Sequence, residues 1–207
     1  VPLNPQSRAD DAGHILEHSR AASVVASGDL TGCVREALAC ADLDVPVLGV
    51  EQLPGAGLPL GELPEAPAHR VAAEDTVNIQ YTSGTTGRPK GCVLSHRYWM
   101  ELGGGLVDEF PHLGPGDTML AAQGFAYIDP PWNVVAAMLA GAHLVVLDAF
   151  HPSTFWSKVR EHAVTYFYCL AAMPTLLLKM PPDPLDRSHR VRVVQCSAIP
   201  PARPEEL

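Results

Sequence analysis

In the segment QYTSGTTGRPKGCVLSH, residues 80–96, positions 82–87 place four hydroxyl side chains and two glycines directly after an apolar strand. Hydroxyl groups and unpaired backbone N–H groups donate hydrogen bonds to phosphate oxygens, and glycines let the backbone approach a ligand closely. Each hydrogen bond to a charged group contributes about 1.5–3 kcal/mol. Together with the positive charge of Lys90, this composition predicts a loop that binds phosphate.

The segment does not fit the P-loop pattern G-x-x-x-x-G-K-[ST]. Counting from Gly84, the second glycine comes too early, and Pro89 precedes Lys90. A Walker-type ATPase is therefore disfavoured. An ordinary glycine-rich turn is the alternative, but the pattern runs over a dozen consecutive positions, which favours a ligand site. Because the loop follows a strand, we expect it at the edge of a sheet, where α/β proteins bind ligands.

On both sides of this loop, short apolar strands alternate with helical segments. This alternation predicts an α/β fold with a layered, mostly parallel sheet and flanking helices. A loop rich in proline and glycine over 52–70 separates a first α/β segment, 1–70, from a second, 71–207. Helices are expected at 8–20, 31–41, 97–110, 131–140, 153–162 and 173–180, and strands at 22–27, 45–50, 76–81, 92–94, 118–122, 144–147, 165–170 and 191–196.

Composition excludes several classes of protein. The 207 residues include 14 basic and 23 acidic side chains, a net charge of −9, so a nucleic acid is not an expected partner. The longest apolar run, 134–147, is too short to span a bilayer, and no segment reads as a signal peptide. Five cysteines without a Cys-x-x-Cys pair indicate free thiols and a cytoplasmic location.

The stretch YTSGTTGRPKGCVLSH closely resembles the phosphate-binding signature of the adenylate-forming superfamily, which includes acyl-CoA synthetases and other AMP-binding enzymes. Cys92 replaces the common valine, at a strand position expected to be buried. The run from Ala136 to Leu177 resembles the family's segment leading to the acyl pocket. The resemblance covers essentially the whole chain, which we interpret as an internal fragment of the large N-terminal domain.

This resemblance implies that the parent protein activates a carboxylic acid with MgATP as an acyl-adenylate and transfers the acyl group to CoA. ATP, Mg²⁺ and CoA are the implied cofactors. The implied phosphate-binding residues are Thr82, Ser83, Gly84, Thr85, Thr86, Gly87 and Lys90. The resemblance assigns no catalytic residue and no metal ligand within this chain.

Two departures affect the implied acyl and adenine pocket. Tyr127 stands where many members carry a histidine beside the carboxylate and ATP, although a half-buried core aromatic is an equal alternative. In QCSAIPP, Cys196 and Ile199 replace a common glycine and proline, whereas Ser197 and Ala198 fit the pocket wall. Asp129 could orient Tyr127, but we expect it to cap the following helix.

Three alternatives therefore remain open beside an acid–CoA ligase: an adenylation enzyme that loads a carrier protein, a member with altered or lost adenylation, and a non-catalytic nucleotide-binding fragment. The family's later motifs and its C-terminal domain do not occur before Leu207, so we expect this chain alone to be inactive.

The pattern HILEH, from His14 to His18, matches a zinc motif in which two histidines lie one helical turn apart. No downstream glutamate offers a convincing third ligand. We therefore interpret the two histidines as solvent-facing helix residues.

Overall fold

The computed structural model describes residues 1–53, 70–82, 87–170 and 172–197. The chain divides into two compact units, Val1–His96 and Arg97–Leu207. The loop expected over 52–70 falls mostly outside the described residues, so the predicted boundary at residue 70 stays a prediction. In the described part of the chain, no helix combines the length and the apolar character needed to cross a membrane.

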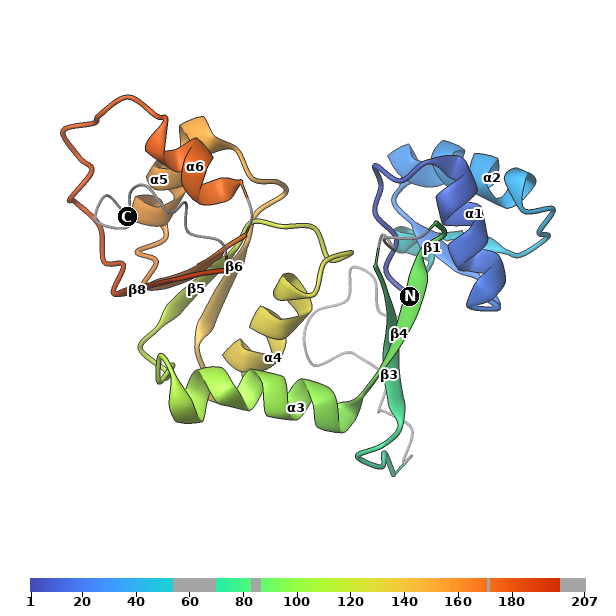
Figure 1. Cartoon of the computed structure of the whole chain (residues 1–207), viewed down its shortest axis with the longest axis horizontal. Helices are drawn as coiled ribbons and strands as arrows, with labels where there is room; N and C mark the ends of the chain where they lie inside the picture. Colours follow the sequence, from blue (N-terminus) through green and yellow to red (C-terminus); the bar gives the residue numbers. More distant parts are fainter. Residues whose placement is uncertain (54–69, 83–86, 171, 198–207) are drawn as a thin grey trace. The chain divides into compact units, whose positions relative to one another are not determined.

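The first unit begins with a small α/β layer (Figure 1). Its parallel strands β1 and β2 pair from Val24 to Ala26, and its two long helices cover them around a core that includes Leu16, Leu38 and Val24. Gly13 allows the two helices to approach closely, since a Cβ there would lie 2.6 Å from the carbonyl oxygen of Ala37. The elements are α1 (Ala9–His18), β1 (Val24–Ala26), η1 (Gly28–Leu30), α2 (Thr31–Cys40), β2 (Val47–Gly49) and η2 (Val50–Gln52).

An antiparallel hairpin completes this unit, formed by β3 (Thr76–Thr82) and β4 (Lys90–Ser95). The two strands were predicted, but the direction of their pairing was not. The phosphate loop therefore lies at the tip of a hairpin and not at the carboxyl edge of a parallel sheet. Cys92 is exposed on β4, so the expectation that this position is buried was wrong.

The second unit is a four-stranded parallel sheet with helices on both faces (Figure 1). The strand order is β6-β5-β7-β8, and each strand follows a helix, as the alternation predicted. The elements are α3 (His96–Gly104), the π-helical turn η3 (Gly105–Glu109), β5 (Thr118–Ala121), α4 (Asp129–Ala140), β6 (His143–Val146), α5 (Pro152–Glu161), β7 (Tyr166–Cys169), α6 (Met173–Leu178) and β8 (Val193–Cys196).

Alternation along the central strands separates two cores. Met119 and Tyr166 face α4 and η3, where small alanines of α4 let the helix lie close to the sheet. Leu120 and Phe167 face α5 and α6 on the other side, with Phe155 stacked edge-on against Phe167 at 5.0 Å. Burial on both faces explains why these strands are almost uninterrupted apolar runs. The predicted layered, mostly parallel α/β architecture is confirmed.

Candidate functional site

The predicted phosphate loop connects the two strands of the hairpin. Thr82 ends β3 and pairs with Lys90, which begins β4. Both residues are exposed, so the loop ends are held together while their side chains stay open to solvent. Four of the predicted phosphate-binding residues lie outside the described residues: Ser83, Gly84, Thr85 and Thr86.

Gly87 has a backbone conformation that side chains disfavour. Its φ is +134°, and a Cβ built there would meet no atom within 4 Å. The requirement for glycine is therefore conformational and not a matter of space. This agrees with the expectation that glycines give the loop backbone its freedom.

The base of the loop depends on a residue that the sequence did not single out. A Cβ on Gly91 would lie 2.8 Å from Cγ2 of Ile79 and 3.0 Å from Cζ of Tyr81. The absence of a side chain at Gly91 therefore gives the Tyr81 ring room to lie across β4. Partial burial raises the pKa of the Tyr81 phenol.

The histidines of HILEH do not simply face solvent, as the sequence suggested. His14 is half-buried and lies against the peptide carbonyl of Pro89, and His18 contacts the hydroxyl of Tyr81. Both histidines therefore contact the hairpin that carries the phosphate loop. No three metal-ligating side chains gather anywhere in the described part of the chain, so a zinc site at HILEH finds no support there.

In the second unit, the carboxyl edge of the parallel sheet offers another candidate site. The connection from β5 leads to β6 on one side, and the connection from β7 leads to β8 on the other, so the chain direction reverses between β5 and β7. Ligands of open α/β sheets bind at such reversals. Gln123 joins these two strand ends, because its amide nitrogen donates to the carbonyl oxygen of Tyr168 over 3.3 Å.

Two predicted pocket residues lie on loops at this edge. Tyr127 follows β5 and is 49% exposed, so its interpretation as a core aromatic was wrong. Ser197 follows β8, is exposed, and donates its backbone N–H to the carbonyl oxygen of Cys169. Ala198 lies outside the described residues. The structure thus places Tyr127 and Ser197 on the same edge of one sheet, with the β7 strand between their strands.

Buried polar groups in α4 lie next in the chain to Tyr127. Asp129 and Asn133, one helical turn apart, are 2% and 1% exposed. One carboxylate oxygen of Asp129 and both polar atoms of the Asn133 amide have no hydrogen-bond partner among the described residues. Burial raises the pKa of Asp129. The expected helix cap was wrong, since Asp129 is the first residue of α4 and Ile128 occupies the N-cap position.

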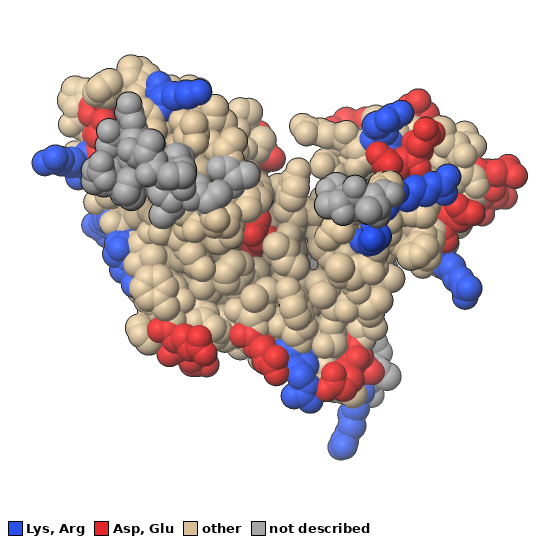
Figure 2. All heavy atoms as spheres, viewed as in Figure 1, with Lys and Arg blue, Asp and Glu red and all other residues tan. Residues whose placement is uncertain are grey.

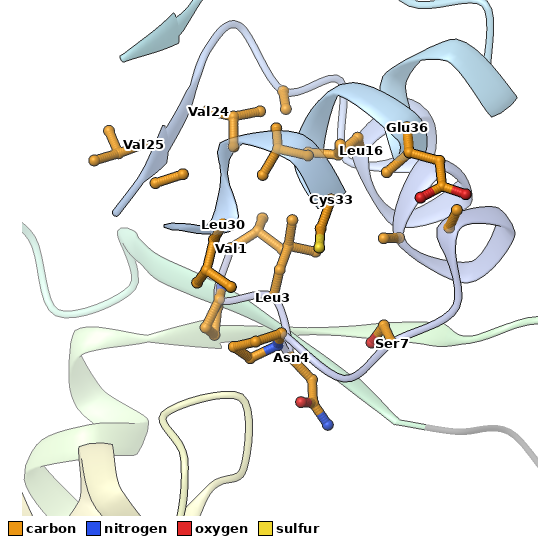
Figure 3. Close-up of a pocket in the computed structure, with 18 of the residues that line it drawn as sticks. Val1, Leu3, Asn4, Ser7, Leu16, Val24, Val25, Leu30, Cys33 and Glu36 are labelled. Atoms are coloured by element: carbon orange, nitrogen blue, oxygen red, sulfur yellow. The ribbon is translucent and has the colours of Figure 1, made fainter. Parts of the chain in front are cut away.

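Two cavities lie away from these residues. One, of about 580 Å³, is a pocket of the first unit that is open to solvent and lined by the amino-terminal segment, α1, α2 and β1, with Val1, Leu3, Leu30 and Cys33 around it (Figure 3). The other, of about 420 Å³, lies in the second unit beside Trp156. None of the predicted site residues that the structure describes lines either cavity.

Charges of both signs are mixed on the surface of the first unit. On the face drawn in Figure 2, acidic and basic side chains lie side by side over the helices of the first unit instead of forming a basic patch. A small phosphate ligand needs only the local positive charge of Lys90 and hydrogen-bond donors of the loop. The negative net charge of the chain therefore does not argue against phosphate binding.

Comparison with known proteins places this geometry in context. A family model described as AMP-binding enzyme matches residues 1–206. A crotonobetaine/carnitine–CoA ligase of Citrobacter koseri is 29% identical over 210 residues, which cover 94% of this chain and 40% of that protein. A ligase of the same name from Shigella sonnei is 34% identical over 125 residues, 60% of this chain and 24% of that protein. The chain thus spans less than half the length of these curated relatives.

Solved structures share the fold. A putative long-chain-fatty-acid–CoA ligase of Rhodopseudomonas palustris aligns with a TM-score of 0.78 and 22% identity, over 96% of this chain and 50% of that one. A luciferase-like enzyme of the mealworm Zophobas morio aligns with a TM-score of 0.77 and 16% identity, over 95% and 47%. At these identities the likeness shows the architecture alone.

Proposed function

The chain belongs to the AMP-binding enzyme family, and we propose that its whole protein is an ATP-dependent acid–CoA ligase. In the first step a substrate carboxylate attacks the α-phosphorus of ATP, a new P–O bond forms, and pyrophosphate leaves. In the second step the CoA thiol attacks the acyl carbonyl and AMP leaves. Both steps depend on positioning and on neutralising phosphate charge.

The observation that carries this proposal is the hairpin that bears YTSGTTGRPKG. Its strands bring Thr82 and Lys90 together, both exposed, and Gly87 has the positive φ that a close backbone approach to phosphate uses. We assign the β- and γ-phosphates of ATP to these residues and to the remaining loop residues Ser83, Gly84, Thr85 and Thr86. Mg²⁺ would accompany the triphosphate, with its ligands outside the residues assigned here.

The acid is proposed to bind at the carboxyl edge of the four-stranded sheet. Tyr127 and Ser197 lie on loops at this edge, and Ala198 follows Ser197 in the sequence. The relatives named as crotonobetaine/carnitine–CoA ligases make carnitine and crotonobetaine the first acids to test. A tyrosine at position 127 cannot supply positive charge near pH 7, so the acid carboxylate needs another cationic group or Mg²⁺.

Acid-dependent exchange of pyrophosphate into ATP tests the first step. The whole protein is assayed with MgATP, labelled pyrophosphate and a panel of acids that includes carnitine, crotonobetaine, and linear and aromatic acids. Exchange that requires one of these acids supports the proposal. Absence of exchange across the panel, in a protein that still binds ATP, would indicate a member that has lost adenylation.

A separate assay identifies the acceptor thiol. The acyl-adenylate formed with an active acid is offered CoA or a carrier protein that bears a phosphopantetheine thiol. Transfer to CoA supports the proposed ligase, whereas transfer to the carrier protein alone would make the protein a loading enzyme.

A further inference from the structure

Two histidines of α1 contact the chain on either side of the phosphate loop. His18 Nδ1 lies 2.6 Å from the hydroxyl of Tyr81, in the strand that enters the loop. His14 Nε2 lies 3.3 Å from the carbonyl oxygen of Pro89, in the segment that leaves it. The two imidazole rings are one helical turn apart, with 5.5 Å between their centroids. A single turn of α1 therefore bridges both ends of the loop.

The contacts of His14 indicate one tautomer of its ring. A peptide carbonyl only accepts hydrogen bonds, so Nε2 of His14 must carry hydrogen and donate it to Pro89. The other ring nitrogen, Nδ1, lies 3.4 Å from Nη1 of Arg88, and a guanidinium only donates. A ring with hydrogen on Nε2 and an acceptor lone pair on Nδ1 satisfies both neighbours.

The tyrosine contact has equally specific support. The ring of Tyr81 crosses β4 where Gly91 leaves room for it, and its edge faces the ring of His18 at 5.8 Å between centroids. A side chain at Gly91 would overlap this ring. The sequence of β4 therefore permits the placement that brings the Tyr81 hydroxyl to His18.

Helix α1 is itself firmly placed. Gly13 lies so close to α2 that an added Cβ would be 2.6 Å from a backbone oxygen, and the adjacent Ile15 and Leu16 are buried. The histidines thus project from an anchored helix toward Tyr81 and Pro89, on the two sides of the loop. Contacts from a rigid element reduce the conformational freedom that the loop must lose when a ligand binds.

We propose that His14 and His18 are positioning residues that fix the two ends of the phosphate loop for nucleotide binding. Neither is assigned a contact with the nucleotide. The inference rests on the proposed function for its effect on ATP, whereas its effect on the hairpin stands on the contacts alone.

A double-mutant cycle in the whole protein tests the contact of His18 with Tyr81. ATP affinity is measured by calorimetry for His18→Ala, Tyr81→Phe and the double variant. Each single change is expected to weaken ATP binding about threefold to tenfold, because it removes one hydrogen bond. The double variant is expected to bind no more weakly than the weaker single one. Independent, multiplying losses would overturn the proposed pairing.

Two further variants separate positioning from general helix effects. His14→Ala is expected to weaken ATP binding about threefold to tenfold, and His14→Gln, which can both donate and accept, should recover at least half of the lost binding free energy. Glu17→Ala changes an exposed residue of the same helix and should leave the affinity unchanged. Equal effects of the alanine and glutamine variants, or a similar loss in Glu17→Ala, would overturn the assignment.

Hydrogen exchange gives a readout that does not need ATP. The amides of the peptide from Gly87 to Ser95 should exchange faster in His14→Ala and His18→Ala than in the wild type, with unchanged exchange in α5. If the wild type fails to bind ATP, the proposed function fails, and exchange alone decides the positioning role. Unchanged exchange in this peptide would overturn it. Tyr81→Phe preserves ring packing, so it remains informative if an alanine variant fails to fold.

Discussion

Asp117 and Arg192, separated by 75 residues in the sequence, form a two-pronged ion pair at the amino edge of the four-stranded sheet. Arg192 Nε lies 2.8 Å from Oδ1 of Asp117, and Nη2 lies 2.7 Å from Oδ2. Thr165 donates to Oδ1 over 2.7 Å. Asp117 directly precedes β5, Arg192 directly precedes β8, and Thr165 directly precedes β7. This network therefore ties three parallel strands together at the edge opposite Tyr127.

We expect Asp117→Asn to lower the free energy of unfolding by about 2–3 kcal/mol, because it removes the charge of the buried partner of a two-pronged pair. Urea denaturation monitored by circular dichroism measures the change. Glu161→Gln is the matched control, since Glu161 pairs with Lys158 on the surface and both side chains are exposed. Exposed pairs contribute little, so this control should be nearly neutral. Similar effects of the two variants would contradict the assignment.

The same pair predicts a specific pH dependence. Hydrogen bonds from Arg192, opposed by burial and aided by Thr165, lower the pKa of Asp117 from 3.8 to about 2. Because the folded pKa lies below the unfolded one, the stabilisation is complete above about pH 5 and is lost as the pH falls toward 2. A shift of this size corresponds to about 2 kcal/mol. The stability difference between wild type and Asp117→Asn should therefore be constant above about pH 5 and shrink toward pH 2.

Replacing two glycines of the first unit's helices by alanine should change the stability in opposite directions. At Gly13 a new Cβ would lie 2.6 Å from the backbone oxygen of Ala37, so Gly13→Ala must separate α1 from α2 and should cost about 1–3 kcal/mol. Gly32, in α2, has no atom within 4 Å of the added Cβ. Gly32→Ala should stabilise by up to about 1 kcal/mol, because alanine favours helix. Thermal unfolding of both variants measures this: the unfolding midpoint should fall in Gly13→Ala and rise in Gly32→Ala.

Much of the fold could be predicted because its signals are local. The alternation of apolar strands and helices located the four parallel strands of the second unit to within about two residues. The same alternation predicted a helix, α4, between β5 and β6. The antiparallel pairing of β3 with β4 was not predicted, since a strand pattern does not state the direction in which two strands pair. Helix starts were also less predictable. Aspartate is a residue type favoured at the N-cap, but α4 begins at Asp129 itself, and the carboxylate is buried.

The candidate site divides in the same way. The phosphate loop is a contiguous motif between two predicted strands. Its position between Thr82, at the end of β3, and Lys90, at the start of β4, therefore followed from the order of the sequence. The contacts of His14 and His18 could not be derived, because they join segments more than 60 residues apart and depend on how α1 is rotated. The role of Gly91 likewise requires the neighbouring strand, whose Tyr81 ring occupies the space that a side chain would fill.

Lys90→Ala should weaken ATP binding by about 10- to 100-fold, the loss expected for one charge-assisted contact of about 1.5–3 kcal/mol. Calorimetry with ATP on the whole protein measures it. Lys158→Ala provides the control, because Lys158 lies on α5 and pairs with Glu161. Since Lys90 is exposed, its replacement should leave the unfolding midpoint nearly unchanged. Unchanged ATP affinity would remove Lys90 from the proposed site.

Replacing Tyr127 should alter the choice of acid more than the stability. The side chain is 49% exposed, so Tyr127→Ala should change the free energy of unfolding by less than about 0.5 kcal/mol. If Tyr127 borders the acid, losing its ring should change the relative kcat/KM of a short and a long acid by about tenfold or more, the scale of a few methylene contacts. Pyrophosphate exchange across the acid panel measures this ratio. Met138→Ala, at a residue of α4 that is 78% exposed, is the control. A Tyr127→Ala profile that matches the Met138→Ala profile would place the acid elsewhere.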